Sequence, residues 1–478
     1  MEDISNHGGA SPLGRMASLS LAVLLAALGT SIANVALPTL SLRFGVSFQQ
    51  VQWVVLAYLL ASTALIVGAG RLGDLLGRRR LLLGGLLLFA AASLAAGLAS
   101  FPALIAARAA QGLGAAVMMA LSMAFVADIL PRERIGRAMG WLGAMSAVGT
   151  ALGPSLGGAL VAALGWRSIF FLLAALAVLA YALARRSLPE MGHVASRGTG
   201  GFDRPGTVLL ALAATAYAMA MTTGRGHFGA LNAAWLAAAL AGGMLFIWRQ
   251  RRAEAPLLRL DMLRDPTLSG GMAMSGLVAT VMMATLVVGP FYLARGLGLG
   301  TAAVGLAMSA GPLLSALSGL PAGAAVDRFG ARGMALTGLL AMLGGAVALS
   351  LTPAARGVPG YIAALLLLTV GYAQFQAANN TQVMAGSGAD KRGLVSGLLN
   401  LARNLGLLSG AGAMGAVFAA AAGTDKLATA APDAVAHGMH AAFAVAAGLI
   451  ALALAIALSA WRAPTNAAAG RRAQGGAR

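Results

Sequence analysis

Residues 70–80 read GRLGDLLGRRR, and residues 323–332 read GAAVDRFGAR. Both follow the pattern Gly-x3-Asp-x2-Gly, with an arginine within the next two residues, and each comes after a long apolar segment. Glycine permits a tight turn, an aspartate beyond a helix end can accept from the first amides of the next helix, and arginine offers a forked donor to a carboxylate. One copy could be an ordinary charged turn, but two matched copies indicate two duplicated halves.

The composition around these stretches is that of a membrane protein. Hydrophobic types make up 59% of the 478 residues and charged types only 10%, against roughly 25% charged residues in an average soluble domain. So few charges cannot coat a globule of this size, which indicates an integral membrane protein and excludes a disordered chain. The chain has no cysteine, which excludes disulfides, thiolate metal sites and cysteine nucleophiles.

Fourteen segments are apolar on all faces and long enough to cross a bilayer as helices, which takes ~20 residues. They span 16–40, 51–70, 81–100, 103–127, 138–162, 168–185, 206–223, 230–248, 269–293, 301–325, 333–351, 359–384, 396–421 and 439–460. The two longest charged linkers bracket one pair of segments and leave six on each side. We therefore expect an all-α membrane protein with a six-helix bundle over 1–185, a linker with two additional helices over 186–268, and a second six-helix bundle with a short tail over 269–478.

The distribution of basic residues predicts the orientation. With a cytoplasmic N-terminus, 25 of the 33 Lys and Arg residues fall on the cytoplasmic side and 6 on the outer side, while Arg108 and Arg403 lie within spans. Because cytoplasmic loops carry the excess of basic residues, this predicts an even number of spans with both termini inside the cell. The net charge of +19 is thus mainly topological, and we expect no nucleic-acid partner, because the arginines are dispersed without interleaved aromatics.

Further motifs follow one another in the expected spans. Residues 34–38 read NVALP, residues 108–114 read RAAQGLG, residues 149–158 read GTALGPSLGG, and Trp166-Arg167 precedes the sixth span. Together with residues 70–80, these strings resemble the major facilitator superfamily, and specifically its fourteen-helix drug:proton antiporter branch, over about residues 16–460. The resemblance implies two six-helix bundles around a central cavity that opens alternately to each side, and export of a small molecule in exchange for protons.

The resemblance also implies two gates. The inner gate would comprise Gly70, Asp74, Gly77, Arg78, Asp327, Arg328 and Arg332, and the outer gate Gly149, Gly153, Pro154 and Gly157. The glycine spacing of the fifth span puts small residues on one face, and Pro154 removes one backbone donor and can kink the helix. Ordinary charged turns and ordinary close packing are the alternative interpretations.

The sequence departs from the family pattern where proton coupling is concerned. The branch usually has an aspartate at the position of Gly29, and an asparagine where this chain has Leu172 and Leu173. None of the 14 acidic residues falls in the middle of a span. Since proton coupling usually needs a buried group that gains and loses a proton, any coupling group here would be peripheral, with Asp74 and Asp128 as candidates.

Polar side chains within spans are the candidate lining of the cavity. A charge at the bilayer centre costs ~3 kcal/mol on insertion scales, so both intramembrane arginines should face the interior. The candidates are Thr30, Asn34, Trp53, Tyr58, Arg108, Gln111, Met283, Tyr292, Gln376, Asn379, Asn380, Asn400, Arg403 and Asn404. The alternatives are hydrogen bonds between helices, worth about 0.6 kcal/mol each, and, for the aromatic and methionine side chains, packing or lipid contact.

From these observations we expect a transporter in the cytoplasmic membrane that exports small, neutral or anionic, amphipathic solutes or drugs by alternating access. An uptake permease or facilitative carrier of the same fold, without carboxylate-based proton coupling, is the alternative. No enzyme is expected, because no span offers a Ser/His, His/Glu or paired-carboxylate cluster; a nucleotide-binding P-loop is absent too. We expect a monomer in the lipid bilayer with a small-molecule substrate, no cofactor and no metal, and with protons as the candidate coupling ion.

Overall fold

The computed structural model describes residues 12–129, 132–189, 203–223, 229–253, 256–258, 260–385 and 392–462. The first part contains α1 (Pro12–Ser31), η1 (Asn34–Ala36), α2 (Leu37–Phe44), α3 (Phe48–Val51), α4 (Trp53–Leu76), α5 (Arg78–Leu98), α6 (Phe101–Ile129), α7 (Arg132–Leu164) and α8 (Arg167–Ser187), followed by α9 (Arg204–Thr222) and α10 (Ala230–Arg252). The remainder contains η2 (Leu260–Arg264), α11 (Pro266–Phe291), η3 (Tyr292–Gly296), α12 (Thr301–Phe329), α13 (Ala331–Leu351), η4 (Ala354–Arg356), α14 (Gly357–Ala385), α15 (Arg392–Ser409), η6 (Gly410–Met414), α16 (Gly415–Ala422) and α17 (Pro432–Arg462).

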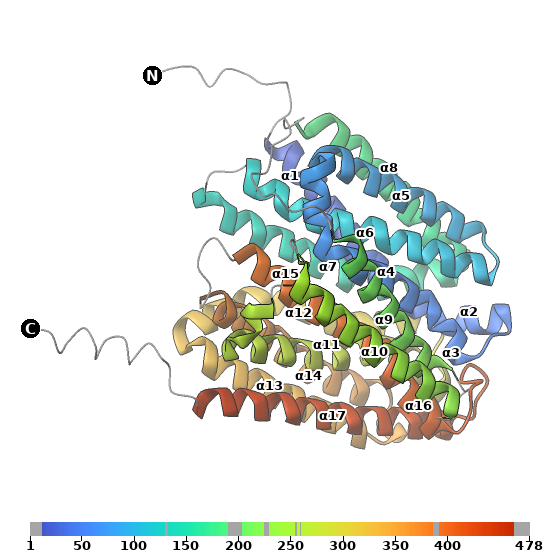
Figure 1. Ribbon diagram of the computed structural model, residues 1–478. Coiled ribbons are helices and arrows are strands. Elements are labelled where there is room, and N and C mark those ends of the chain that lie inside the picture. The colour runs from blue at the N-terminus through green and yellow to red at the C-terminus, as the bar shows by residue number, and fades with distance from the viewer. Residues whose placement is uncertain are drawn as a thin grey trace, which may run out of the picture.

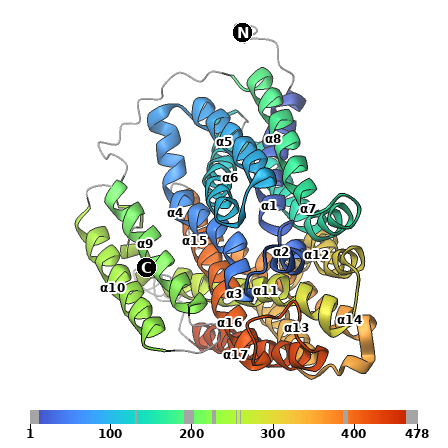
Figure 2. The ribbon, with the colours of Figure 1, turned by 90° about the vertical axis from the view of Figure 1, so that its right-hand side faces the viewer.

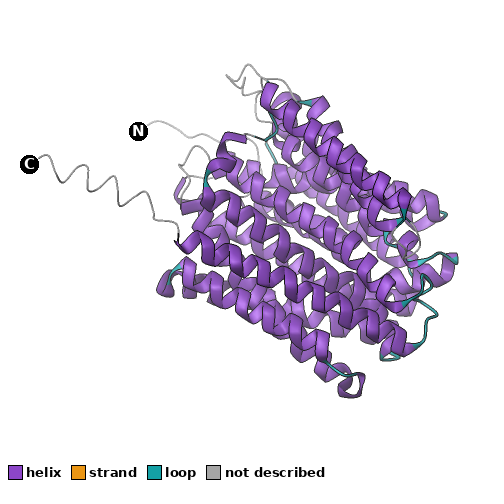
Figure 3. Ribbon diagram, turned by 60° about the horizontal axis from the view of Figure 1, so that its bottom comes forward, coloured by secondary structure: helices purple, strands orange, loops and turns teal. Residues whose placement is uncertain are grey.

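The described chain is helical and contains no strand, as Figure 3 shows. Thirteen of its helical segments are long and apolar enough to cross a membrane. The predicted span 301–325 falls within α12, whose apolar part in the described residues, Thr301–Ser315, is shorter than such a span. The prediction of an all-α membrane protein is therefore confirmed.

The two repeated stretches adopt the same local structure. Gly77 joins α4 to α5 with φ 90° and ψ 119°, and Gly330 joins α12 to α13 with φ 84° and ψ 144°. A side chain is strained at such positive φ values, which explains why both copies have glycine at this position. The helices that follow, α5 and α13, are both 21 residues long. The sequence repeat thus corresponds to a structural repeat at these two turns.

Two of the predicted spans are interrupted. The first breaks after Ser31 into η1 and α2, because Pro38 near the start of α2 lacks an amide proton for a continuous helix. The Asn34 side chain donates to the carbonyls of Thr30 and Ser31, at 3.0 and 3.1 Å, and so satisfies groups at the break. The span 396–421 contains the π-helical turn η6 between α15 and α16.

Most helix packing occurs within two sets. Helices α1, α4, α5, α6, α7 and α8 contact one another, and α11 to α17 form a second group (Figure 1). The sets meet along α7 with α12 and along α4 with α15. We call the end where α8 ends and α9 begins the linker end, and the opposite end, with the turns at Gly45, Gly165 and Gly423, the far end.

Helices α9 and α10 pack against each other, and α9 contacts α4 at the side of the molecule (Figure 2). The Trp53 indole donates to the Thr222 hydroxyl at 3.2 Å and joins α4 to α9. At the linker end, the buried Asp203 carboxylate accepts from Gln250 at 2.8 Å and pairs with Arg249 at 3.3 Å, which fixes α9 to α10. Only 11% of the apolar window of α10 is buried, so most of this apolar helix is not covered by the rest of the described chain.

Candidate functional site

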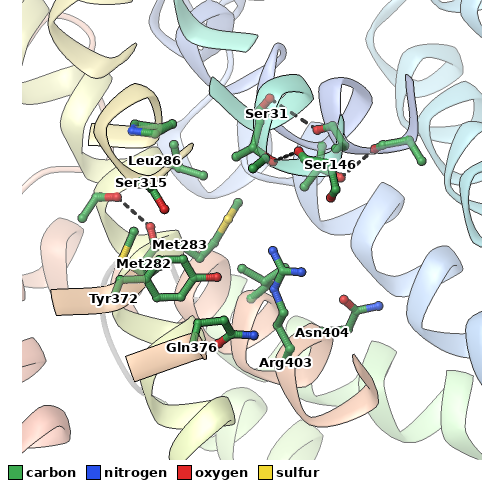
Figure 4. A pocket seen from close by; sticks show the side chains of 18 of the residues that line it. Ser31, Ser146, Met282, Met283, Leu286, Ser315, Tyr372, Gln376, Arg403 and Asn404 are labelled. Atoms are coloured by element: carbon green, nitrogen blue, oxygen red, sulfur yellow. Dashed lines mark hydrogen bonds between the residues drawn. The ribbon is translucent and has the colours of Figure 1, made fainter. Parts of the chain in front are cut away.

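A cavity of about 390 Å³ lies between the two sets of helices. Helices α1, α4, α6 and α7 line it on one side, and α11, α12, α14 and α15 on the other. Figure 4 shows Ser31 and Ser146 on the first side, opposite Tyr372, Gln376 and Arg403. The cavity is thus lined by residues from the N-terminal and the C-terminal parts of the chain.

Half of the predicted cavity residues line this space. They are Thr30, Tyr58, Met283, Gln376, Asn380, Arg403 and Asn404. Arg403 is the charged residue of the lining, and no aspartate or glutamate belongs to the part of the lining that the structure describes. Gln376 and Asn380 are four residues apart on α14 and share a face, whereas Asn379 points away and donates to the carbonyl of Gly271 on α11 at 3.1 Å.

Arg108 lies outside the cavity and is completely buried. Its guanidinium donates to the carbonyls of Val54 at 2.7 Å and Gly29 at 3.0 Å, and to the Gln111 side chain at 2.9 Å. It also lies 4.4 Å from the centroid of the Tyr58 ring. These contacts join α1, α4 and α6, so the structure gives Arg108 and Gln111 a packing position.

Four other predicted residues also lie away from the cavity lining. Asn34 donates to backbone carbonyls at the helix break described above, and Trp53 donates to Thr222 of α9. Tyr292 is buried with its ring centroid 5.8 Å from that of Tyr361. Asn400 is half-buried on α15 and does not belong to the lining.

Much of the cavity lining on α14 was not predicted from the sequence. Tyr361, Leu365, Thr369, Tyr372, Gln376 and Asn380 all face the cavity. Their spacing of three or four residues is the signal that could have found them, because such residues lie on one helix face. The Tyr361 hydroxyl is buried and has no hydrogen-bond partner among the described residues. Small and hydroxyl side chains of α1 and α7, such as Ala27, Ser146 and Thr150, were also missed.

The two halves are in close contact at the far end. A Cβ added to Gly158 of α7 would come within 2.8 Å of the Gly305 Cα on α12, and one added to Gly305 would collide with the Pro154 carbonyl. The predicted outer-gate residues Gly149, Gly153 and Gly157 instead face α1 and the break after it, against Leu24, Ser31 and Ile32. Of the predicted set, only the Pro154 backbone takes part in this contact between halves.

The short helix α3 and the residue after it add a second contact between the halves, which was not predicted from the sequence. The Phe48 ring lies edge-on to Phe291 and Phe418, with centroids 4.9 and 5.4 Å apart. The Gln52 amide donates to the carbonyl of Ala411 in η6 at 2.6 Å, and the Phe48 amide to that of Asp425 at 2.8 Å. A π-turn changes the backbone hydrogen-bonding pattern, and here one of its carbonyls accepts from a side chain of the other half.

The linker end is more open. The Asp74 carboxylate lies inside the last turn of α4, not beyond the helix as predicted, and pairs with Arg78 at 2.9 Å. Arg78 also donates to the Ala124 carbonyl on α6 at 3.4 Å. In the second copy, Asp327, Arg328 and Arg332 are exposed. In the first copy, nothing lies within 4 Å of a Cβ added at Gly70. The cavity residue nearest this end on α14, Asn380, is exposed, whereas Tyr361 at the far end is buried.

No cluster of three or more His, Cys, Asp or Glu side chains that could hold a metal occurs in the described ranges. The cavity lining contains the Arg403 guanidinium together with amide, hydroxyl and methionine side chains. These groups can bind a solute through hydrogen bonds, charge and apolar contact.

The chain is similar to known transporters along most of its length. It is 33% identical to the uncharacterized transporter YebQ of Escherichia coli over 83% of this chain and 87% of that protein. It is 33% identical to the multidrug resistance protein Stp of Mycobacterium tuberculosis (81% and 72%), and 28% identical to the riboflavin transporter RibZ of Clostridioides difficile (84% and 87%).

The fold is that of solved transporters. A bacterial homolog of the human lysosomal transporter Spinster matches 95% of this chain and 98% of its own with a TM-score of 0.71 at 16% identity. The D-xylose-proton symporter matches 93% and 97% with a TM-score of 0.67, also at 16% identity. The family model for the Major Facilitator Superfamily matches residues 19–411. This chain, with its repeated turns and its cavity between two sets of helices, therefore belongs to the Major Facilitator Superfamily.

Proposed function

We propose that this protein exports small, amphipathic, neutral or anionic solutes or drugs across the cytoplasmic membrane by alternating access. The observation that carries this proposal is the cavity itself, which is lined by both halves, includes Arg403 and has no acidic side chain in its described lining. A lipophilic cation would meet an unfavourable positive charge there. Relatives named as multidrug resistance protein and riboflavin transporter support a small organic solute.

The proposed membrane architecture has fourteen spans in two six-helix bundles, with α9 and α10 as the additional pair. Including α12 as a span gives an even number, which agrees with both termini lying on the cytoplasmic side. In this orientation the linker end faces the cytoplasm, so the structure would correspond to a state that is closed to the outside. Alternating access then requires the Gly158–Gly305 and Gln52–Ala411 contacts to separate.

Uptake or facilitated diffusion by the same fold is the second candidate. It is favoured by the lack of an acidic side chain in the described lining, since carboxylates are common proton-coupling groups. Asp74 already pairs with Arg78, and the side chain of Asp128 lies outside the described part of the structure.

Direction-resolved transport would test these candidates. Purified protein in vesicles of known orientation would be assayed with ethidium, N-phenyl-1-naphthylamine and 8-anilino-1-naphthalenesulfonate, which are cationic, neutral and anionic. We expect saturable movement of the neutral or anionic probe out of the cytoplasmic compartment. Export of ethidium alone would contradict the proposed selectivity, and net movement only down a concentration gradient, in either direction, would favour the facilitative carrier. Vesicles without protein are the control.

A further inference from the structure

Arg403 is held differently from the other intramembrane arginine. Arg108 has partners for all three of its nitrogens, whereas the Arg403 Nε is buried without a hydrogen-bond partner among the described residues. The Arg403 side chain lines the cavity and extends into it from α15 (Figure 4). No ion pair with Arg403 occurs in the described ranges either. An arginine left in this way inside a membrane protein is in position for an anion that arrives from outside the protein.

The groups beside Arg403 include hydrogen-bond donors. Gln376 and Asn404 line the same part of the cavity (Figure 4). Amide NH2 groups and a guanidinium together form a donor set that suits the oxygens of a carboxylate, sulfonate or phosphate. All three residues come from α14 and α15, so the donors belong to the second half alone.

The rest of the lining is apolar or weakly polar. Met119, Met282, Met283, Met308 and Leu286 supply flexible apolar surface. The first half contributes small and hydroxyl side chains, among them Ala26, Ala116 and Ser146, and no charged group in its described part. The complementary ligand therefore has one oxyanion at one end and an apolar body.

We propose that Arg403, with Gln376 and Asn404, forms an oxyanion subsite that selects solutes with one acidic group on an apolar body. This inference rests on the proposed transport function and assigns the anionic class to it. The same chemistry occurs in an anionic lipid headgroup, so the test separates a free solute from a lipid.

The test is direct binding to the full-length protein in phosphatidylcholine nanodiscs. The probes are 8-anilino-1-naphthalenesulfonate and N-phenyl-1-naphthylamine, which share one scaffold and differ only in the sulfonate. Probe bound to empty discs is subtracted. The variants are Arg403→Gln, which keeps a polar side chain but removes the charge, and Arg403→Lys, which keeps the charge but removes the paired N–H donors of the guanidinium. Arg356→Gln, at an exposed arginine of η4, is the matched control.

We expect Arg403→Gln to weaken binding of the sulfonate about tenfold or more, as loss of a charge-assisted hydrogen bond would. Binding of the neutral probe should change less than about twofold, Arg403→Lys should partly restore the sulfonate preference, and Arg356→Gln should resemble the wild type. The same measurement in phosphatidylglycerol discs shows whether a lipid headgroup can occupy the subsite. If the anionic lipid lowers the affinity of the wild type for the sulfonate but does not lower that of Arg403→Gln, the result also supports the subsite and shows that the headgroup competes for it.

Equal loss of both probes in Arg403→Gln, or no sulfonate binding to the wild type, would overturn the subsite. The result is independent of transport direction. If vesicles show no export while sulfonate binding depends on Arg403, the proposed export fails and the subsite stands. If export occurs while the probe preference is unaffected by Arg403, the subsite fails and the proposed export stands.

Discussion

At the scale of single residues, the two intramembrane arginines have different surroundings. Arg108 contacts the carbonyl of Gly29, at the position where the family resemblance leads one to expect an aspartate. The guanidinium is therefore satisfied by carbonyls, an amide and the Tyr58 ring rather than by a carboxylate. A Cβ at Gly29 would lie 3.0 Å from the Phe89 ring and 3.1 Å from the Tyr58 hydroxyl, so any side chain there needs these rings to shift.

Replacing Arg108 should therefore destabilise the protein. Arg108→Lys keeps the charge but cannot reach three separate acceptors, and we expect a loss of at least about 2 kcal/mol, since hydrogen bonds to charged groups contribute ~1.5–3 kcal/mol each. The measurement is the thermal unfolding midpoint of the purified protein. Arg403→Lys serves as the comparison and should shift the midpoint much less, because Arg403 is half-buried. Equal shifts would contradict the structural position of Arg108.

At the scale of helices, glycine sets how closely the halves approach. Gly158 and Gly305 bring α7 and α12 into backbone contact, whereas Gly149, Gly153 and Gly157 do the same for α7 and α1 within one half. The small-residue spacing of the fifth span predicted close packing correctly. It did not identify the partner helix, because a helix has several faces and the sequence does not say which neighbour each one meets.

Gly305→Leu should hold the far end open. The added side chain collides with the Pro154 carbonyl, which is backbone and cannot rotate away. Because the chain has no cysteine, a single Ser315→Cys reporter in the cavity can be labelled selectively with a membrane-impermeant maleimide. We expect faster labelling from the far-end side. Gly448→Leu, where nothing lies within 4 Å of an added Cβ, is the control. An unchanged rate in Gly305→Leu would argue against this contact as a gate.

Gln52→Leu should loosen the same end more gently. It removes the hydrogen bond to the Ala411 carbonyl, and a single such bond contributes about 0.5–1.5 kcal/mol, so we expect an increase of roughly two- to tenfold in labelling of Ser315→Cys from the far-end side. Gln50→Leu, two residues earlier in α3, is the matched control, because Gln50 bonds locally with Ser47. If both variants behave alike, the bond to Ala411 does not keep this end closed.

At the scale of the whole molecule, the two ends should face opposite sides of the membrane. Ser100→Cys lies in the exposed far-end turn between α5 and α6, and Arg251→Cys lies at the exposed linker end of α10. In intact cells we expect an impermeant maleimide to label the first and to reach the second only after permeabilisation. The opposite pattern would invert the orientation, and labelling of both in intact cells would refute the proposed number of spans.

The helical membrane fold, the duplicated turns and the family could all be predicted from the amino-acid sequence. These features depend on local properties: long apolar runs demand backbone hydrogen bonds within a helix, and the glycines at 77 and 330 permit the positive φ of both turns. Short-range spacing also found part of the cavity lining, because Gln376 and Asn380 share a helix face.

Which polar residues face the cavity and which hold helices together depends on how the helices pack, and the amino-acid sequence did not reveal it. Arg108 and Arg403 look alike in sequence, since each is a lone arginine in an apolar span. Their surroundings differ because acceptors at Gly29 and Val54, distant in sequence, reach one and not the other. The same holds for Gln52 and Gly305, whose contacts join residues far apart along the chain. Local sequence patterns determine where helices form, whereas the packing of the helices against one another determines what each side chain contacts.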